Sequence, residues 1–172
     1  VARWDGATWG PLGSGLGEGV YALADYNGDL VAGGGFNLGN GADGLAQWDG
    51  SAWVPVGGTS GGGVRTLSVL AGDLYAAGDF NWIGGAPATR IARYNGNAWS
   101  TLGSGVGYGR ANALVGDADS AGTYLYVGGD FSETGDGLSS ACMARWRVHE
   151  TTSGSDRWAM KGRDMQHTGR AD

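Results

Sequence analysis

Cysteine, lysine and proline are scarce in this chain of 172 residues. Cys142 is the one cysteine, so an internal disulfide is excluded and the redox compartment stays open. Lys161 is the one lysine among 11 basic residues, which face 17 acidic residues and leave a formal net charge of -6. Binding to a nucleic-acid duplex needs a concentrated positive face, and the sequence has no basic cluster. We therefore expect no nucleic-acid partner.

Long hydrophobic runs are also missing. No stretch approaches the ~20 consecutive apolar residues of a membrane helix, so we expect no membrane span. Glycine, in contrast, is abundant, with 37 residues. The glycines recur with a regular period, and eight Trp, seven Tyr and three Phe accompany them. This combination favours a packed repeat protein over a disordered chain.

One unit, clearest at residues 72–103, is repeated along the chain. Its marker is an aromatic residue before a tight turn, which recurs every 44 to 52 residues at Trp4, Trp48, Tyr94 and Trp146. Short apolar segments with the alternation of strands precede and follow this marker. Repeats of about 40 to 50 residues with several strands each are typical of β-propellers, in which each blade packs against its neighbours.

We therefore predict an all-β protein, a β-propeller built of four-stranded antiparallel blades, with about three and a half blades in this chain. A half blade occupies residues 1–12, three blades follow at 19–57, 63–103 and 109–162, and a tail covers 163–172. The repeated aromatic residues, with the Phe that ends each second strand, should form the blade cores: Trp4, Trp9, Phe36, Trp48, Trp53, Phe80, Tyr94, Trp99, Phe131, Trp146 and Trp158.

The connection between the last two strands of a blade has its own signature. In the third copy Asn95 and Gly96 separate Tyr94 from Trp99. An Asn-Gly pair favours a two-residue type I′ hairpin turn, because both residues tolerate a positive φ. The flanking aromatic rings should then meet across the two strands.

A glycine pair closes the second strand, at Gly34-Gly35 and Gly128-Gly129, and two aromatic residues follow, such as Trp48 and Trp53. This pattern resembles kelch-type repeats and the propeller of galactose oxidase-like proteins. It is most similar to the short glycine-rich propeller repeats of large secreted bacterial proteins. The resemblance implies an extracellular or cell-surface binding or scaffolding role. The copper and radical chemistry of galactose oxidase is not implied, because its metal ligands find no match here.

The end of the chain resembles the opening segment of PQQ-like propeller proteins. The residues that carry this resemblance are Trp158, Met160, Asp164 and the run from Gln166 to Arg170. It implies the start of a truncated second propeller, and it does not imply a bound quinone.

Two repeats combine an acid after the second strand with an arginine in the third strand. Asp79 accompanies Arg93 and Asp130 accompanies Arg145, whereas the copy without the acid has Gln47 in place of the arginine. This covariation predicts cross-strand ion pairs between Asp79 and Arg93 and between Asp130 and Arg145.

Binding residues are expected where loops open on one face of the propeller. Trp82 and Ile83 form an apolar loop tip without a counterpart in the other copies, although they could also fold over the adjacent blade. Tyr108, with Trp82, offers a stacking platform for a sugar. At the start of the inner strand one position varies between copies, as a ligand-reading or an unconstrained position would: Tyr21, Arg65 and Asn112.

Catalytic chemistry finds little support in the sequence. His149 and His167 have no second ligand at metal-binding spacing, and residues 25–29 lack the glutamate that completes a calcium loop. We predict no catalytic residue, metal or cofactor, and a non-catalytic binding or scaffolding module. The alternatives are the propeller fragment of a larger enzyme, an oxidase or a glycan-active one, and a lectin-like carbohydrate-binding propeller.

Three and a half blades do not close a ring. An open arc exposes unpaired strand edges, which favour association. We expect either self-association, in which two copies form a six- or seven-bladed ring, or the missing blades of a longer chain. A protein or glycan ligand would bind on the loop face.

Overall fold

The computed structural model describes residues 1–120, 122–135, 137, 139 and 142–148. Every regular element in this part of the chain is a β-strand, which confirms the all-β prediction. The described residues accordingly include no helix of the length and apolarity that a membrane crossing needs. Trp158, the predicted tail and the predicted fourth strand of the last blade lie outside the described residues.

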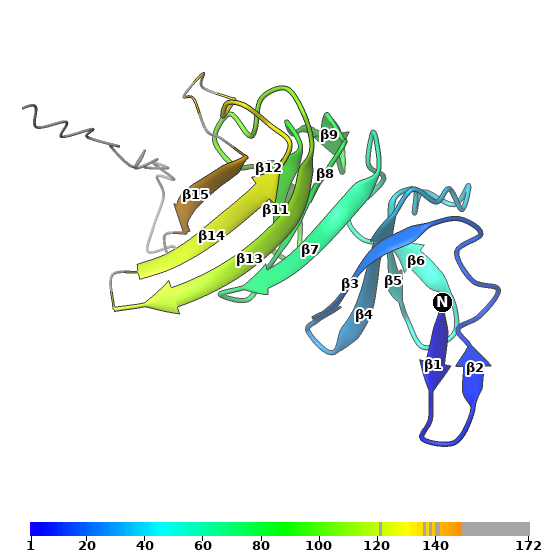
Figure 1. Ribbon diagram of the computed structural model, residues 1–172. Helices are drawn as coiled ribbons and strands as arrows, with labels where there is room; N and C mark the ends of the chain where they lie inside the picture. Colours follow the sequence, from blue (N-terminus) through cyan, green and yellow to red (C-terminus); the bar gives the residue numbers. More distant parts are fainter. Residues whose placement is uncertain (121, 136, 138, 140–141, 149–172) are drawn as a thin grey trace, which may run out of the picture.

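The strands form one N-terminal hairpin, three larger antiparallel sheets and a small hairpin within a loop (Figure 1). Within each of them, neighbouring strands pair in chain order. The N-terminal hairpin is β1 (Ala2–Trp4) and β2 (Trp9–Pro11). The first sheet holds β3 (Val20–Tyr26), β4 (Asp29–Gly34), β5 (Leu45–Trp48) and β6 (Trp53–Pro55). The second sheet holds β7 (Val64–Leu70), β8 (Asp73–Gly78), β11 (Ile91–Tyr94) and β12 (Trp99–Thr101). The third sheet holds β13 (Ala111–Asp119), β14 (Gly122–Gly129) and β15 (Met143–Val148), and the loop hairpin is β9 (Trp82–Ile83) with β10 (Ala86–Pro87).

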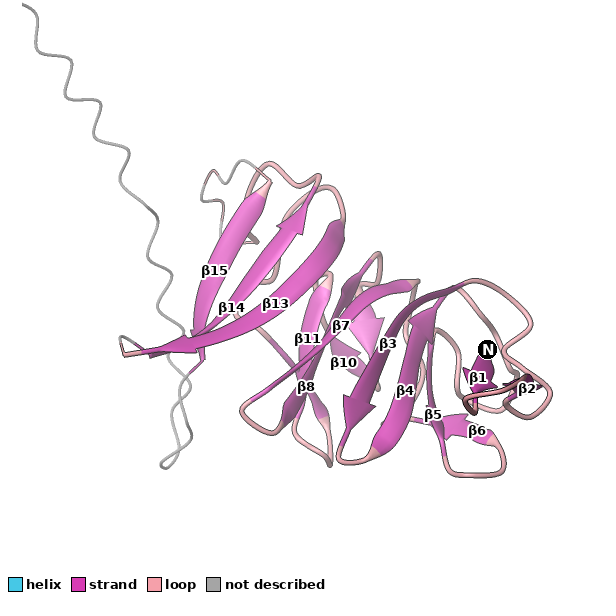
Figure 2. Cartoon of the chain, turned by 60° about the horizontal axis from the view of Figure 1, so that its bottom comes forward, coloured by secondary structure: helices cyan, strands magenta, loops and turns pink. Residues whose placement is uncertain are grey.

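The sheets stand side by side in a curved row, as Figures 1 and 2 show. The first strand of each sheet lies next to the first strand of the following sheet, so β3 neighbours β7 and β7 neighbours β13. The backbone N–H of Leu114 on β13 donates to the hydroxyl of Thr66 on β7, at 3.2 Å. Each sheet therefore presents the same strand to the same edge of the row.

The hydrophobic core is divided into three clusters, each of which lies between two neighbouring elements. One joins the N-terminal hairpin to the first sheet, one joins the first sheet to the second, and one joins the second to the third. The phenylalanine that follows the second strand is buried in every cluster, as Phe36, Phe80 and Phe131. The first and second sheets thus bury apolar side chains on both of their faces.

In the first and second sheets a tryptophan on the outer strand ties the sheet to the unit before it. The indole N–H of Trp53 donates to the carbonyl of Leu12 at 3.2 Å, and that of Trp99 donates to the carbonyl of Val56 at 2.9 Å. Both rings are only 5 % exposed. The aromatic residue thereby contributes apolar area and satisfies a backbone carbonyl at the same interface.

The predicted cross-strand aromatic contact forms, but the predicted turn is wrong. Tyr94 and Trp99 face each other with ring centroids 5.1 Å apart, so four residues form the loop and not two. The side-chain oxygen of Asn95 accepts hydrogen bonds from the backbone N–H groups of Asn97 and Ala98, both at 3.0 Å. This Asx-type capping satisfies the longer loop, and within it only Gly96 has a positive φ.

Trp4 and Trp9 are exceptions to the predicted blade cores. They contact each other at 5.5 Å between ring centroids, but Trp9 is 70 % exposed whereas its counterparts Trp53 and Trp99 are buried. The reason is positional, because no described sheet precedes the N-terminal hairpin and covers its outer face. Of the remaining predicted aromatics, Trp48 and Tyr94 are half-buried and the others that the structure describes are buried.

One glycine in each sheet is required by a close approach of backbone. A Cβ at Gly34, Gly78 or Gly129 would collide with the carbonyl oxygen of Gly19, Gly63 or Arg110, respectively. The equivalent pairs are therefore Gly33-Gly34, Ala77-Gly78 and Gly128-Gly129, so the first sheet is offset by one residue from the predicted Gly34-Gly35 pair. In the second and third sheets the first member tolerates a side chain, as Ala77 shows, whereas a Cβ at Gly33 in the first sheet would crowd Val64.

Substitution of Gly129 and Gly128 tests this distinction. Gly129→Ala should lower the free energy of unfolding by about 1 to 3 kcal/mol, because the added methyl group overpacks against backbone that cannot move aside. Gly128→Ala should leave it unchanged or raise it slightly, since a Cβ there meets its nearest atoms only at 3.9 Å. Urea unfolding followed by tryptophan fluorescence measures both. Equal effects of the two substitutions would contradict the assignment.

The indole hydrogen bond makes a second prediction. Trp99→Phe should cost about 1 to 3 kcal/mol of unfolding free energy, because the Val56 carbonyl loses its buried donor. Trp9→Phe is the matched control in an exposed copy of the same position, and it should change stability by less than about 0.5 kcal/mol. Thermal unfolding monitored by circular dichroism would reveal comparable losses if the inter-sheet hydrogen bond were unimportant.

Candidate binding surface

The first strand of every sheet carries a β-bulge at the same place. The register shifts between Val20 and Ala22, between Val64 and Thr66 and between Ala111 and Ala113. The three residues left unpaired by these shifts are Tyr21, Arg65 and Asn112. A bulge re-aims the side chain of the extra residue, and bulges are frequent at functional edges of sheets. The positions that vary in the sequence are thus set apart by the backbone itself.

All three bulges lie at one end of the sheets, where the loops that enter the first strand and leave the second strand meet. Tyr21 and Asn112 are exposed and Arg65 is half-exposed. Around Tyr21 the chain makes room with glycine, since a Cβ on Gly19 or Gly35 would approach the Tyr21 side chain to 2.8 or 2.9 Å. We call this end, defined by Tyr21, Arg65, Asp79, Arg110, Asn112 and Asp130, the rim.

Side chains of the rim contact one another from sheet to sheet. The Arg65 guanidinium lies 5.8 Å from the centroid of the Tyr21 ring. Its Nε donates to Asp79 Oδ2 at 2.8 Å, and the other oxygen of Asp79 lies 3.5 Å from Arg110 Nε. Arg110 in turn donates its backbone N–H to Asp130 at 2.6 Å. One continuous polar row therefore crosses all three sheets.

The row is electrically balanced, with two arginines and two aspartates. The carboxylate of Asp79 orients two guanidinium groups, of which Arg110 is 58 % exposed at its side chain. Oriented but accessible N–H donors bind oxygen-rich groups such as carboxylates or hydroxyls, and the adjacent Tyr21 ring offers an apolar face. The rim thus offers hydrogen-bond donors and an aromatic face to a polar ligand.

The predicted ion pair between Asp79 and Arg93 is wrong. Arg93 lies opposite Tyr75 on β8 and its Nε donates to Asp73 at 2.7 Å, whereas Asp79 follows the end of β8 and turns to the rim. Asp73 begins the second strand and Asp79 follows that strand's end, so the two acids serve opposite ends of the sheet. The covariation in the sequence correctly predicted an ion pair for Arg93, but its partner is Asp73 and not Asp79.

The predicted pair between Asp130 and Arg145 fails for the same reason. Arg145 lies opposite Tyr126, and its guanidinium is 4.6 Å from the centroid of the Tyr124 ring. Tyr124 occupies the position of Asp73 in the second sheet and of Asp29 in the first, where Gln47 donates to the carboxylate at 2.7 Å. In each sheet the third-strand residue therefore contacts the residue that lies two positions before its register partner on the second strand.

The loop residues predicted to bind a ligand differ in their exposure to solvent. Ile83 is fully buried and bridges to Ser60, so the prediction that it forms a contact surface is wrong. Trp82, next to it, is exposed, and its ring covers Gly61 so closely that a Cβ there would collide with it. Tyr108 is 82 % exposed, the largest exposure among the large apolar side chains described. The loop hairpin thus closes over the core and leaves Trp82 and Tyr108 to solvent.

Sequence reasoning missed Arg110 as a rim residue and assigned Asp79 to a structural pair. A signal for Arg110 was present, because the other two copies have Gly19 and Gly63 at that place.

Among the described residues, no group of three or more His, Cys, Asp or Glu side chains is placed to hold a metal ion.

Two carboxylates in the turns at the opposite end of the sheets, those of Asp5 and Asp49, have a lowered pKa. Hydrogen bonds from the backbone N–H groups of Thr8 and Ala7 lower the pKa of Asp5, and those of Ala52 and Ser51 lower the pKa of Asp49. A depressed pKa in the folded state contributes stability above the ordinary aspartate value, and this contribution is lost as the pH falls through the folded value.

Substitution of Asp73 and of Asp79 compares the buried Arg93–Asp73 ion pair with the Arg65–Asp79 ion pair at the rim. Asp73→Asn should cost about 1.5 to 3 kcal/mol of unfolding free energy, because Arg93 and Asp73 are only 13 % and 14 % exposed. Asp79→Asn should cost about 1 kcal/mol or less, since Arg65 and Asp79 are about one-third exposed and screened by solvent. Urea unfolding at low salt and at 1 M NaCl compares them, and a larger loss for Asp79→Asn would contradict this ranking.

Comparisons of the chain with protein-family models, with curated proteins and with solved structures found no match. The kelch-like resemblance therefore stays a prediction.

Proposed function

We propose that the three sheets are blades of a kelch-like β-propeller and that the N-terminal hairpin is the outer half of a further blade. Three observations support this proposal. The sheets pair their strands in chain order, the first strands β3, β7 and β13 lie at one edge of the row, and equivalent residues form each interface. Propeller blades share these features, because each blade buries both faces against neighbours.

The module binds a polar ligand at the rim and does not transform it. The observation that carries this proposal is the bulge repeated in all three sheets. The backbone feature is constant, whereas the side chain it presents changes from tyrosine to arginine to asparagine. A constant scaffold with variable presented groups is the arrangement of a recognition surface.

An extracellular or cell-surface location belongs to this proposal and rests on the resemblance to repeats of secreted bacterial proteins. Fractionation of the producing cell would place the protein outside the cytoplasm, and recovery from the cytoplasm alone would contradict this location.

A carbohydrate ligand is the second candidate, because Tyr108 is almost fully exposed on a loop at the rim end and could stack on a sugar ring.

Combined substitution of the bulge residues tests the rim. The chain is screened against a glycan array and a panel of purified extracellular proteins, and each ligand found is measured with the triple variant Tyr21→Ala, Arg65→Ala and Asn112→Ala. We expect binding to weaken more than about tenfold, since aromatic and arginine side chains dominate binding energies. Loss of glycan binding in Tyr108→Ala would identify the carbohydrate candidate.

The matched control is a second triple variant at the opposite end of the sheets, Thr8→Ala, Ser51→Ala and Asn97→Ala. These residues lie in the turns between the third and fourth strands. The control should keep the wild-type affinity. A ligand whose binding survives the rim variant, or is lost equally in both variants, would place recognition elsewhere on the molecule.

A further inference from the structure

The N-terminal hairpin has an unpaired edge. Within the described residues β1 pairs only with β2, whereas the equivalent strands β5 and β11 also pair with a second strand on their other side. Ala2, Arg3 and Trp4 are accordingly all exposed. Such an edge presents free backbone donors and acceptors to another strand.

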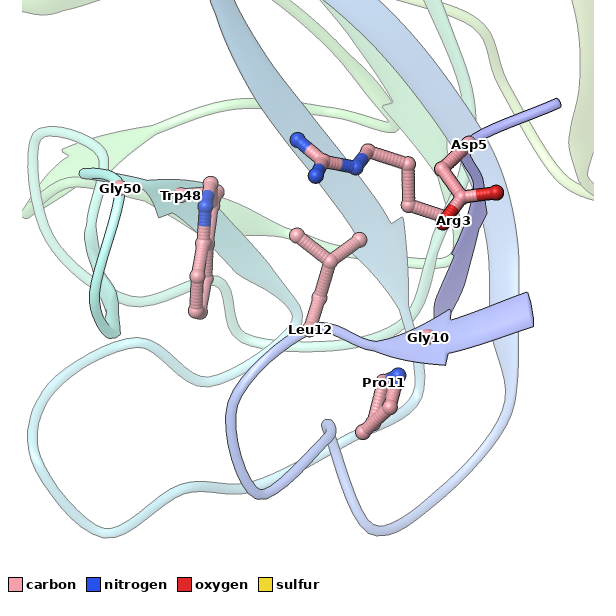
Figure 3. Close-up of a pocket in the computed structure, with 7 residues that line it drawn as sticks. All are labelled: Arg3, Asp5, Gly10, Pro11, Leu12, Trp48 and Gly50. Carbon is pink, nitrogen blue, oxygen red and sulfur yellow. The ribbon is translucent and has the colours of Figure 1, made fainter. Parts of the chain in front are cut away.

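A pocket lies beside this edge, where the hairpin meets the first sheet. It has a volume of about 200 Å³, and Figure 3 shows its lining. Arg3, Pro11 and Leu12 come from the hairpin, and Trp48 and Gly50 come from the first sheet. The side chains of Arg3 and Trp48 both border the open space.

The next interface shows what fills the equivalent space. There Tyr26, the last residue of β3, packs edge-on against Tyr94 with ring centroids 6.1 Å apart, and its hydroxyl would touch a Cβ at Gly96. Tyr94 and Gly96 are the counterparts of Trp48 and Gly50. At the third interface Leu70, the last residue of β7, packs against the cluster that contains Trp146. We call this pocket the socket, because it lies where an apolar residue that ends a first strand packs in the other two interfaces.

Arg3 indicates that an aspartate would fit beside the pocket. Its counterparts Gln47 and Arg93 contact Asp29 and Asp73, which begin the second strand of their sheets. Among the described residues no ion pair involves Arg3. In Tyr26–Asp29 and Leu70–Asp73 the apolar residue and the aspartate are separated by two turn residues, the second of which is glycine.

The exposure of Leu23 on the first sheet is independent evidence that a strand can pack at this place. It is 52 % exposed, although its counterparts Leu67 and Leu114 pack into the clusters between sheets. Leu23 lies on the first strand, at the side that faces the N-terminal hairpin. A first strand placed beside β3 would cover it, as β3 and β7 flank each other in the next interface.

We propose that a β-hairpin with the turn sequence apolar-x-Gly-Asp docks here. Its second strand pairs with β1, its aspartate binds Arg3, its apolar residue fills the socket at Trp48, and its first strand covers Leu23. A second copy of the chain is not the occupant, because both of its described hairpins with this turn already pair within their own sheets. The hairpin comes from a separate segment of the same repeat type.

A synthetic hairpin with the sequence of residues 64–79, cross-linked between its two ends, is the probe. We expect saturable binding to the 172-residue chain, measured by fluorescence anisotropy, with slowed hydrogen exchange of the Ala2–Trp4 amides. Chain variant Arg3→Ala and peptide variant Asp73→Ala should each weaken binding about tenfold, and their combination should weaken it little further, because the two groups contact each other. Peptide variant Leu70→Ser should also weaken binding, through the socket.

Arg147→Ala is the charge-matched control on the third sheet, and it should bind the peptide like the wild type. Absence of binding, or binding that is insensitive to Arg3 and to Asp73 of the peptide, would overturn the proposal. Light scattering gives a separate check on the occupant. A concentration-dependent dimer that Arg3→Glu dissociates would show that a second copy occupies the site, which also overturns it. The residues substituted in these tests, Arg3 and Arg147 of the chain and Leu70 and Asp73 of the peptide, all lie outside the rim, so ligand binding there is tested independently.

Discussion

The structure depends on one constraint, which is that the first and second sheets each have two apolar faces. A four-stranded sheet that buries phenylalanine and tryptophan towards one neighbour and leucine, isoleucine or valine towards the other is stable only in a row. The indole N–H groups of Trp53 and Trp99 also need a neighbour, because they donate to backbone carbonyls of the preceding unit. Wherever a neighbour is absent, the equivalent group is left exposed, as Trp9 and Leu23 are.

Packing and recognition are separated along the length of the strands. The buried side chains in the middle of the sheets form the inter-sheet clusters, and these side chains are apolar. At the rim, the bulge releases one residue from the pairing and the close approach at Gly34, Gly78 and Gly129 holds the adjacent strand ends together. The rim can therefore change its side chains without disturbing the core, which is why the binding proposal rests on it.

Much of the architecture could be read from the repeat alone. The strand order, the facing of Tyr94 and Trp99 and the burial of Phe36, Phe80 and Phe131 follow from period and alternation, which depend on local backbone geometry. The partners of charged side chains could not be predicted in this way. Whether Arg93 meets Asp73 or Asp79 depends on which end of a strand each acid occupies and on the register between strands.

The sequence by itself determined the all-β class, the repeat unit and the variable positions Tyr21, Arg65 and Asn112, because composition and period act along the chain. Only the tertiary structure decided that Asp79 joins Arg65 to Arg110 across two sheets, that Ile83 is buried and that a socket beside Trp48 stands open. Arg65 and Asp79 lie in one sheet, 14 residues apart in the sequence, whereas the contact of Asp79 with Arg110 and the pocket beside Trp48 lie between neighbouring units. All of these contacts depend on strand register and on how the sheets pack, and no local pattern in the sequence encodes them.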